Sequence, residues 1–376
     1  MFKFIVKEIV TSITSILIFL LIMFYGINIL IPGDFLTPLR LMLSQAELDA
    51  LRETLGVNDP LYQRYFRWIL GVFNGEITTG GFRQRSGKDI MSTVLPTIQV
   101  LIPSFTLAFY LSRIPSIKTP ISKLHKNKIF SDTLATLFIS LFPPIVLFLI
   151  DEKIENFYTF LAITFDLEKT PVSILTISEN KFDIILLLFL FSVTLFIVQS
   201  LDVLLNNKIR KSGFVFSIMI LFYIFLFQND ILISDIILNS KNAFKTIGIL
   251  SIFFVGEYIL INNVITQNIA REPHILTARA LGYSKHKIYN KHILRNSFGP
   301  FATRLTLGLP YTIASLVIVE STTGWKGMGS VLYQSIMNQD SNAAMGLFLL
   351  LALLTAILRI TISVVQVIID PRVRLK

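Results

Sequence analysis

Long apolar stretches alternate with short polar ones along most of this chain. A helix needs about 17 to 25 mainly apolar residues to cross the hydrocarbon core of a bilayer. Eight stretches meet this requirement, at residues 9–31, 94–112, 133–150, 184–201, 213–229, 246–266, 297–319 and 342–369. The pattern therefore predicts an all-α, polytopic membrane protein with about eight transmembrane helices.

The overall composition supports the same class. Apolar residues make up 53% of the 376 residues, charged residues only 15%, and the mean hydropathy is +0.67. A soluble domain has more charged surface than this. The chain has no cysteine, which excludes disulfides and thiolate metal sites. A net charge of +10 on such a chain favours contact with the lipid bilayer over contact with nucleic acid.

The charges between the spans predict an orientation, because cytoplasmic loops collect Lys and Arg. With the N-terminus inside, the cytoplasmic segments hold 19 basic and 5 acidic residues, and the outer segments hold 13 basic and 18 acidic residues. Every inner segment is then net basic, and no outer segment is. Both termini are therefore expected in the cytoplasm.

One cytoplasmic segment, residues 267–296, has a distinct local pattern. Pro273 suits the first turn of a helix, Gly282 suits the left-handed residue that ends one, and Ser284 is a helix-capping residue. The segment is therefore expected to form two short helices with a bend between them, at about 273–281 and 285–295.

The charges of the second short helix are unusual. Lys285 and Lys287 fall in its first turn, where the helix dipole disfavours cations by a few tenths of a kcal/mol each. This placement suggests an external partner for the segment. The alternative is an ordinary cytoplasmic loop that is basic only because of its side of the membrane.

The same segment carries a family signature. Thr277-Ala278-Arg279-Ala280-Leu281-Gly282, followed by His292-Ile293-Leu294-Arg295-Asn296, resembles the EAA loop of binding-protein-dependent ABC importer permeases, in the branch for dipeptides, oligopeptides and nickel. Leu281 and Ile293 stand where that branch usually has Lys and Ala. The resemblance implies that the segment couples to an ATPase through Thr277, Ala278, Arg279, Ala280, Gly282, Ser284, Lys285, His292 and Arg295.

Other stretches match the same family in the expected order. Pro32-Gly33-Asp34 and Leu55-Gly56-Val57-Asn58-Asp59-Pro60-Leu61 resemble its N-terminal segments, and residues 324–329 resemble its WPGLG hairpin. The resemblance implies that a binding protein docks at the residues of this hairpin and its surroundings, namely Trp325, Gly327, Gly329 and Asp340. Lys326 replaces the usual Pro, and Arg359, Ser363 and Gln366 also depart from the branch, so nickel or metallophore import remains an alternative to peptide import.

The resemblance implies a domain organisation and a set of partners. A transmembrane helix at 1–31 and an extracytoplasmic segment at 32–93 would precede the rest of the permease core at 94–150 and 246–376. The core would have the six helices of a type I permease, counting the helix at 1–31, and an insertion at 151–245 would add two extra spans. The chain would be a permease subunit in a bacterial cytoplasmic membrane, without a nucleotide site of its own. Its expected partners are a second permease subunit, two cytosolic ATPases that hold ATP and magnesium, a solute-binding lipoprotein and a peptide substrate.

Two other classes of protein fit the apolar pattern. A secondary transporter would need coupling-ion residues near the middle of the membrane and often has inverted repeats; Glu257 is one such residue, but no repeat is evident. A membrane-anchored sensor or assembly protein would need a sizeable soluble domain, and the longest segment outside the spans is 62 residues. No HExxH, GxSxG or paired-carboxylate motif indicates catalysis.

Three charged residues fall within predicted spans, which makes them candidates for function. Glu257 lies near the middle of the sixth span, Arg304 lies in the seventh and Arg359 lies in the eighth. They either form ion pairs inside the helix bundle or line the substrate path. Because a lone carboxylate near mid-bilayer costs several kcal/mol, Glu257 is expected to pair with Arg304 or Arg359.

The predicted topology can be tested by cysteine accessibility, because the chain contains no native cysteine. Single cysteines at positions 160, 208 and 238 should react with an impermeant reagent from the outside, the inside and the outside, in that order. Labelling of position 208 from outside intact cells would contradict the eight-span topology.

Overall fold

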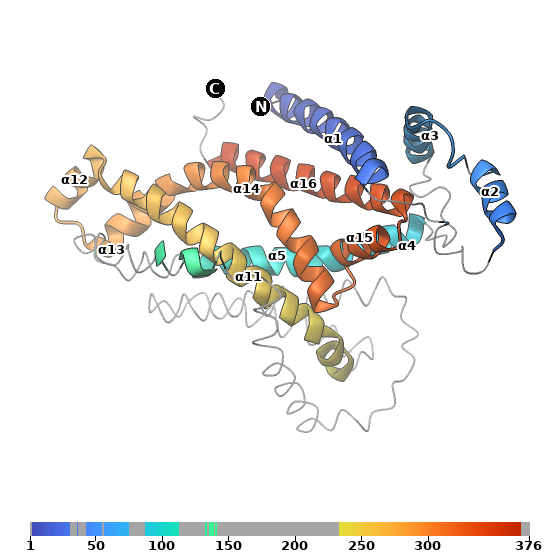
Figure 1. Ribbon diagram of the computed structural model, residues 1–376. Helices are drawn as coiled ribbons and strands as arrows, with labels where there is room; N and C mark the ends of the chain where they lie inside the picture. Colours follow the sequence, from blue (N-terminus) through green and yellow to red (C-terminus); the bar gives the residue numbers. More distant parts are fainter. Residues whose placement is uncertain are drawn as a thin grey trace. The chain divides into compact units, whose positions relative to one another are not determined.

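The computed structural model describes residues 2–30, 36, 43–54, 56–74, 87–112, parts of 132–140 and 233–369, and all regular secondary structure in these residues is helical (Figure 1). The predicted all-α class is therefore confirmed. Five of these helices are long and apolar enough to span a membrane. They are α1 (Phe2–Leu30), α5 (Val94–Leu111), α11 (Ile233–Ala270), α14 (Leu294–Thr323) and α16 (Ser341–Ile369).

Shorter helices lie between the long ones. They are α2 (Gln45–Thr54), α3 (Leu61–Phe73), α4 (Gly87–Ser92), α12 (Pro273–Ala280), α13 (Lys285–Ile288) and α15 (Met328–Met337), together with a π-helical turn at Tyr289–Ile293. The described part of the chain therefore belongs to a multi-pass membrane protein with helical connections.

The five long helices coincide with five of the eight predicted spans. The other three predictions, 133–150, 184–201 and 213–229, lie outside the described residues apart from short pieces before residue 141. Helix α11 begins at Ile233, earlier than the predicted start at residue 246. The prediction followed apolarity, whereas Ser240, Lys241 and Asn242 cost a helix little compared with Gly or Pro.

The chain divides into two compact units. Unit 1 comprises Met1–Val94, Leu309–Val317 and Lys326–Lys376, and unit 2 comprises Leu95–Gly308 and Ile318–Trp325. Helices α1, α3, α15 and α16 therefore belong to unit 1, and α5, α11, α12 and α13 belong to unit 2.

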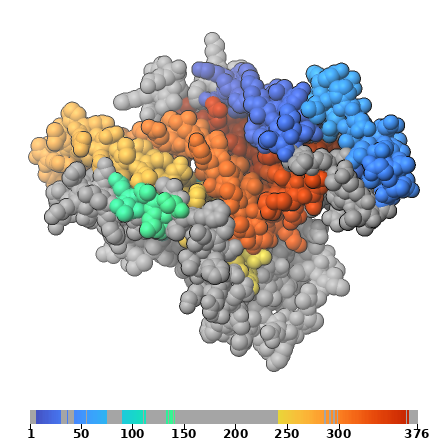
Figure 2. Space-filling view, viewed as in Figure 1, coloured from blue at the N-terminus to red at the C-terminus, as the bar shows by residue number. Residues whose placement is uncertain are grey.

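In unit 1, the amphipathic helix α3 packs on the first span. Its Tyr65 ring lies 5.2 Å from the ring of Phe24 in α1 and 6.4 Å from the ring of Trp68. Tyr65 and Trp68 are buried, whereas Phe66 on the opposite face is 62% exposed. Helices α2 and α3 lie at the surface of the space-filling view, in blue (Figure 2).

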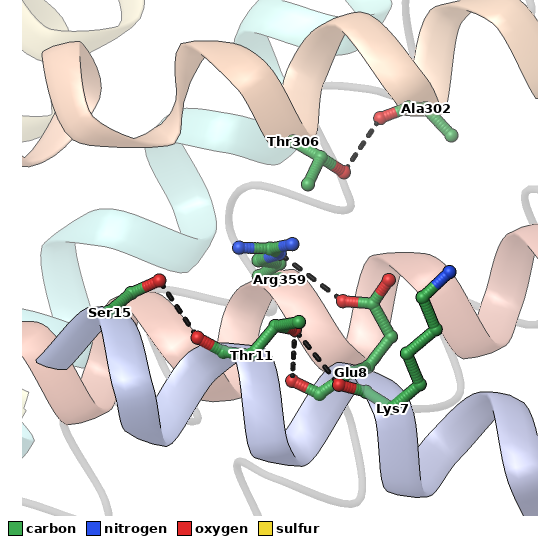
Figure 3. Close-up of polar contacts among 7 residues, drawn as sticks. All are labelled: Lys7, Glu8, Thr11, Ser15, Ala302, Thr306 and Arg359. Atoms are coloured by element: carbon green, nitrogen blue, oxygen red, sulfur yellow. Dashed lines mark hydrogen bonds and ion pairs between the residues drawn. The ribbon is translucent and has the colours of Figure 1, made fainter.

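The first and last spans of unit 1 run antiparallel. Arg359 Nε lies 3.3 Å from Glu8 Oε2 in an ion pair (Figure 3). The rings of Phe19 and Phe348 meet at 5.9 Å, eleven residues after Glu8 and eleven residues before Arg359, a rise of about 16 Å along each helix. The start of α1 and the end of α16 therefore lie on the same side of unit 1.

In unit 2, aromatic side chains join three spans. The ring of Phe105 in α5 stacks on that of Phe254 in α11 at 4.9 Å. Tyr258 of α11 meets Phe301 of α14 at 5.6 Å, and Phe109 of α5 meets the same ring at 5.4 Å. The hydroxyls of Thr246 and Thr323 lie 2.8 Å apart and join α11 to α14 by a hydrogen bond. These contacts hold α5, α11 and α14 together around a buried core.

The Glu8–Arg359 ion pair generates a stability prediction. The side chains are only 21% and 37% exposed, so removing one partner leaves a partly buried, uncompensated charge. We expect Glu8→Gln and Arg359→Gln each to lower the free energy of unfolding by about 1–3 kcal/mol, measured by thermal unfolding in detergent. The exposed Lys7 beside Glu8 provides a control, because Lys7→Gln should change little.

The double variant Glu8→Gln with Arg359→Gln tests whether the two side chains stabilise each other. It should lose clearly less stability than the two single variants do together, because the second substitution removes the charge that the first left unpaired. A loss equal to their sum would show that the two side chains do not interact.

Candidate functional site

The short helix α12 ends in a left-handed turn. Gly282 has φ +74°, and the N–H groups of Tyr283 and Gly282 donate to the carbonyl oxygens of Ala278 and Arg279 at 3.2 and 3.0 Å. This pair of hydrogen bonds is the Schellman motif, which favours glycine at the left-handed position. A Cβ added to Gly282 would meet no atom within 4 Å, so the backbone conformation alone demands glycine. The predicted helix and its ending residue are confirmed.

The second half of the segment begins as predicted but ends differently. The N–H of Lys287 donates to Ser284 Oγ at 3.3 Å, which confirms Ser284 as the cap of α13. The chain then continues through the π-helical turn Tyr289–Ile293 directly into α14, so the separate short helix predicted at 285–295 is wrong. The prediction ended the helix where apolar sequence begins, although no Pro or Gly interrupts the backbone there. Insertions of π-helix often occur at functional sites.

A cluster of rings ties α12 to the π-helical turn. The His292 ring stacks on Tyr283 with centroids 6.0 Å apart and lies 6.5 Å from the His274 ring. Lys287 Nζ lies 4.0 Å from the centroid of the Tyr283 ring, and His274 Nε2 lies 3.3 Å from Asn296 Nδ2. His292 therefore holds the segment together from inside. The family signature did not include His274 or Tyr283, although Tyr283 directly follows the left-handed glycine.

The segment defined by α12, Gly282 and α13, which we call the junction, has a buried and an exposed face. Ile275 and Ala278 are buried, whereas Leu276 and Leu281 are 57% and 66% exposed. Five of the residues that were predicted to couple to an ATPase are also exposed, namely Thr277, Arg279, Ala280, Gly282 and Ser284. Ala278, which was also predicted to take part in coupling, packs inward with 3% exposure. The side chains of Lys285 and Arg295 lie outside the described part of the structure.

The intramembrane charges do not pair as predicted. Arg359 pairs with Glu8 in unit 1. Within the described residues, Glu257 forms no ion pair with Arg304 or with any other residue, so the predicted pairing is wrong. The sequence did not suggest Glu8 as the partner, because the antiparallel contact of the first and last spans is a property of the fold.

The turn after α14 and its surroundings contain the four residues that were predicted to dock a binding protein. Trp325 is only 8% exposed, and its Nε1–H donates to the Pro96 carbonyl at 2.9 Å, which fixes the end of α14 to the start of α5. Gly327 and Gly329 are buried. The carboxylate of Asp340 accepts a hydrogen bond from the N–H of Ala343 at 3.0 Å and caps α16.

Trp325, Gly327 and Gly329 are thus buried and Asp340 is half-buried, and their docking role stays a prediction. The exposed side chains of this region include Lys326, Gln334 and Asn338, and the large apolar side chains of Tyr333 and Met337 are 47% and 62% exposed. A sequence motif marks where a hairpin occurs, but it does not distinguish residues that build the hairpin from those on its surface.

Comparison with known proteins places the chain among transport components. The family described as binding-protein-dependent transport system inner membrane component matches residues 71–375, and the corresponding N-terminal family matches residues 1–84. Together these matches cover almost the whole chain.

Individual relatives are similar over nearly the same length. The oligopeptide transport system permease protein AppB of Bacillus subtilis is 24% identical over 91% of this chain and 90% of its own. A putative peptide permease protein of Brucella ovis is 24% identical over 96% of this chain and 93% of its own. The oligopeptide transport system permease protein OppB of Mycoplasma genitalium is 22% identical over 100% of this chain and 77% of its own.

Proposed function

Because this chain belongs to the family of binding-protein-dependent transport system inner membrane components, we propose that it is the permease subunit of an ATP-driven importer of oligopeptides or dipeptides. The names of the relatives from Bacillus subtilis, Brucella ovis and Mycoplasma genitalium support the peptide substrate. Membership in a family that depends on a binding protein argues against the secondary transporter and the membrane-anchored sensor that the apolar pattern left open.

The observation that carries the proposal is the junction formed by α12, Gly282 and α13. Its exposed face combines Leu276 and Leu281 with the charge of Arg279, a mixture that suits docking on another protein. Its buried face and the stacked rings of Tyr283 and His292 hold it as one body. Such a body transmits displacement without bending.

The mechanism follows from this rigidity. Each junction of a permease pair would bind a cytosolic ATPase, which supplies the nucleotide and magnesium. Closure of the two ATPases on ATP would draw the junctions together, and α11 and α14, which are continuous with the junction at its two ends, would move with it. The permease pair would thereby alternate between inward-open and outward-open states.

The solute-binding lipoprotein would dock on α15 and on the turn that precedes it. The exposed side chains Lys326, Tyr333 and Met337 of α15 and its preceding turn provide one basic and two large apolar contacts. We propose that these residues belong to the docking surface together with the predicted residues Trp325, Gly327, Gly329 and Asp340.

The proposal places the chain in the cytoplasmic membrane of a bacterium, with both termini in the cytoplasm. The Glu8–Arg359 and Phe19–Phe348 contacts support part of this topology, because they put the start of α1 and the end of α16 on one side. The excess of Lys and Arg in the predicted inner segments supports the cytoplasm as that side.

Reconstitution tests the function and the junction together. Proteoliposomes that contain this chain, the second permease and two ATPases should hydrolyse ATP and take up peptide when the binding lipoprotein is present. We expect Gly282→Val to reduce both activities strongly, because a β-branched residue at φ +74° costs on the order of 1 kcal/mol or more and opposes the turn. Gly282→Asn is the matched control, since asparagine tolerates this conformation, and it should retain most activity.

The experiment tests the proposed function and the role of the left-handed turn separately. If the wild-type complex takes up no peptide with ATP and lipoprotein, the proposed function is wrong. If uptake is normal in Gly282→Val, the complex is a peptide importer but the left-handed turn plays no part in coupling.

A further inference from the structure

Two opposite charges in unit 2 lie inside candidate membrane spans. Glu257 lies in the span Lys241–Ala270, and Arg304 lies in the span Gly299–Thr323. Neither side chain forms an ion pair within the described part of the chain, which contrasts with the paired Arg359. The two charges therefore differ from an ordinary structural ion pair in a helix bundle.

The two side chains lie on neighbouring parts of one surface. Glu257 is half-buried, and its Oε1 lies so close to Gly308 that a Cβ on that glycine would approach it to 2.7 Å. Arg304 precedes Gly308 by four residues, which is one helical turn on the same face and about 6 Å along the axis. Arg304 is exposed, and so is Tyr311, with 76% exposure, on the following turn of this face.

Gly308 leaves space for the Glu257 carboxylate because it has no side chain. Any larger residue would require Glu257 Oε1 to move, because real Cβ atoms do not approach other atoms to 2.7 Å. The carboxylate of Glu257 therefore lies against α14, and the backbone of Arg304 lies one helical turn away on the same helix.

Charged side chains in membrane proteins avoid lipid and face a partner or a water-filled cavity. From this constraint and the placement of the two groups, we infer that Glu257 and Arg304 form a two-charge subsite for a zwitterionic peptide in the translocation path. Glu257 receives the α-ammonium group and Arg304 receives the α-carboxylate. This inference rests on the proposed function and specifies the chemical class of its substrate.

The spacing and the chemistry of the two groups suit a short peptide. An extended chain spans about 3.3–3.6 Å per residue. The two charged groups are separated by about one helical turn plus the reach of the arginine side chain, and this distance fits a peptide of two or three residues. The planar guanidinium can bind a carboxylate through two parallel hydrogen bonds. Within the described residues neither charge has an ion-pair partner, so a passing peptide could neutralise each of them.

The first test measures the charge of this surface without any substrate. In the cysteine-free chain, a thiol introduced by Tyr311→Cys should react with water-soluble methanethiosulfonates, and the cationic reagent should react faster than the anionic one. Glu257→Gln should lower the ratio of the two rates severalfold, because the carboxylate attracts the cationic reagent and repels the anionic one. Arg304→Gln should raise the ratio.

Arg359→Gln is the control for this test, because it also removes a charge from a span but one that is paired with Glu8. It should leave the ratio unchanged. Failure of both reagents to label position 311 would overturn the inference, since the surface would then face lipid or a closed interface. A ratio that is the same in Glu257→Gln and Arg304→Gln as in the parent would overturn it as well.

The second test uses peptide uptake by the reconstituted complex, with the same binding lipoprotein throughout. A free tripeptide is compared with its N-acetylated and its C-amidated forms. Glu257→Gln should reduce the preference for the free amino terminus by severalfold, and Arg304→Gln should do so for the free carboxyl terminus. Glu257→Asp, which keeps the charge, should retain more of the preference than Glu257→Gln and so distinguishes lost charge from lost folding.

The outcomes of the uptake test separate the two proposals. If the wild-type complex imports none of the three peptides, the proposed function fails, and this inference fails with it. If the wild-type complex imports the free peptide and both glutamine variants keep both preferences, the function stands and the two-charge subsite is wrong.

Discussion

Hydrocarbon cannot solvate backbone polar groups or charges, and this constraint governs most of what the described residues do. It explains why the five long apolar segments are helices, whose backbone hydrogen bonds are internal. It also makes each charge inside a span informative. Arg359 satisfies the constraint by pairing with Glu8. Among the described residues Glu257 and Arg304 have no such partner, and we therefore assign them to a polar path.

The same constraint makes helix ends important, because each end leaves unpaired backbone groups. The chain ends α12 with the left-handed Gly282, caps α13 with Ser284 and caps α16 with Asp340. Only Tyr283 separates Gly282 from Ser284 along the chain, so the two lie within about 7 Å of each other. They produce a stiff bend between two spans, which is the property that a coupling element needs.

Local signals made part of this structure predictable. The apolar lengths predicted five helices that the structure describes, and Pro273, Gly282 and Ser284 predicted the first short helix, the bend and the next cap. Each of these features depends on residues within one or two helical turns, so the sequence alone contains the necessary information.

Contacts between distant residues were not predictable in this way. Glu8 and Arg359 are separated by most of the chain, and the sequence offered Arg359 only as one of two possible partners of Glu257. The motif around Trp325 was recognised, but its hydrogen bond to Pro96 depends on how α14 meets α5. The continuation of α13 into α14 through a π-helical turn also had no signal, because its residues suit an ordinary helix equally well.

The central claim is that the exposed face of the junction binds a cytosolic ATPase. Adjacent residues provide the most direct measurement, because Leu276 is 57% exposed and Ile275 is fully buried. In the otherwise cysteine-free chain, Leu276→Cys should cross-link to the ATPase subunit through a short thiol-reactive linker in inside-out vesicles, and Ile275→Cys should not. If Leu276→Cys reacts with free reagent but never cross-links to the ATPase, or if it is labelled only from the outer side, the junction is not the coupling element.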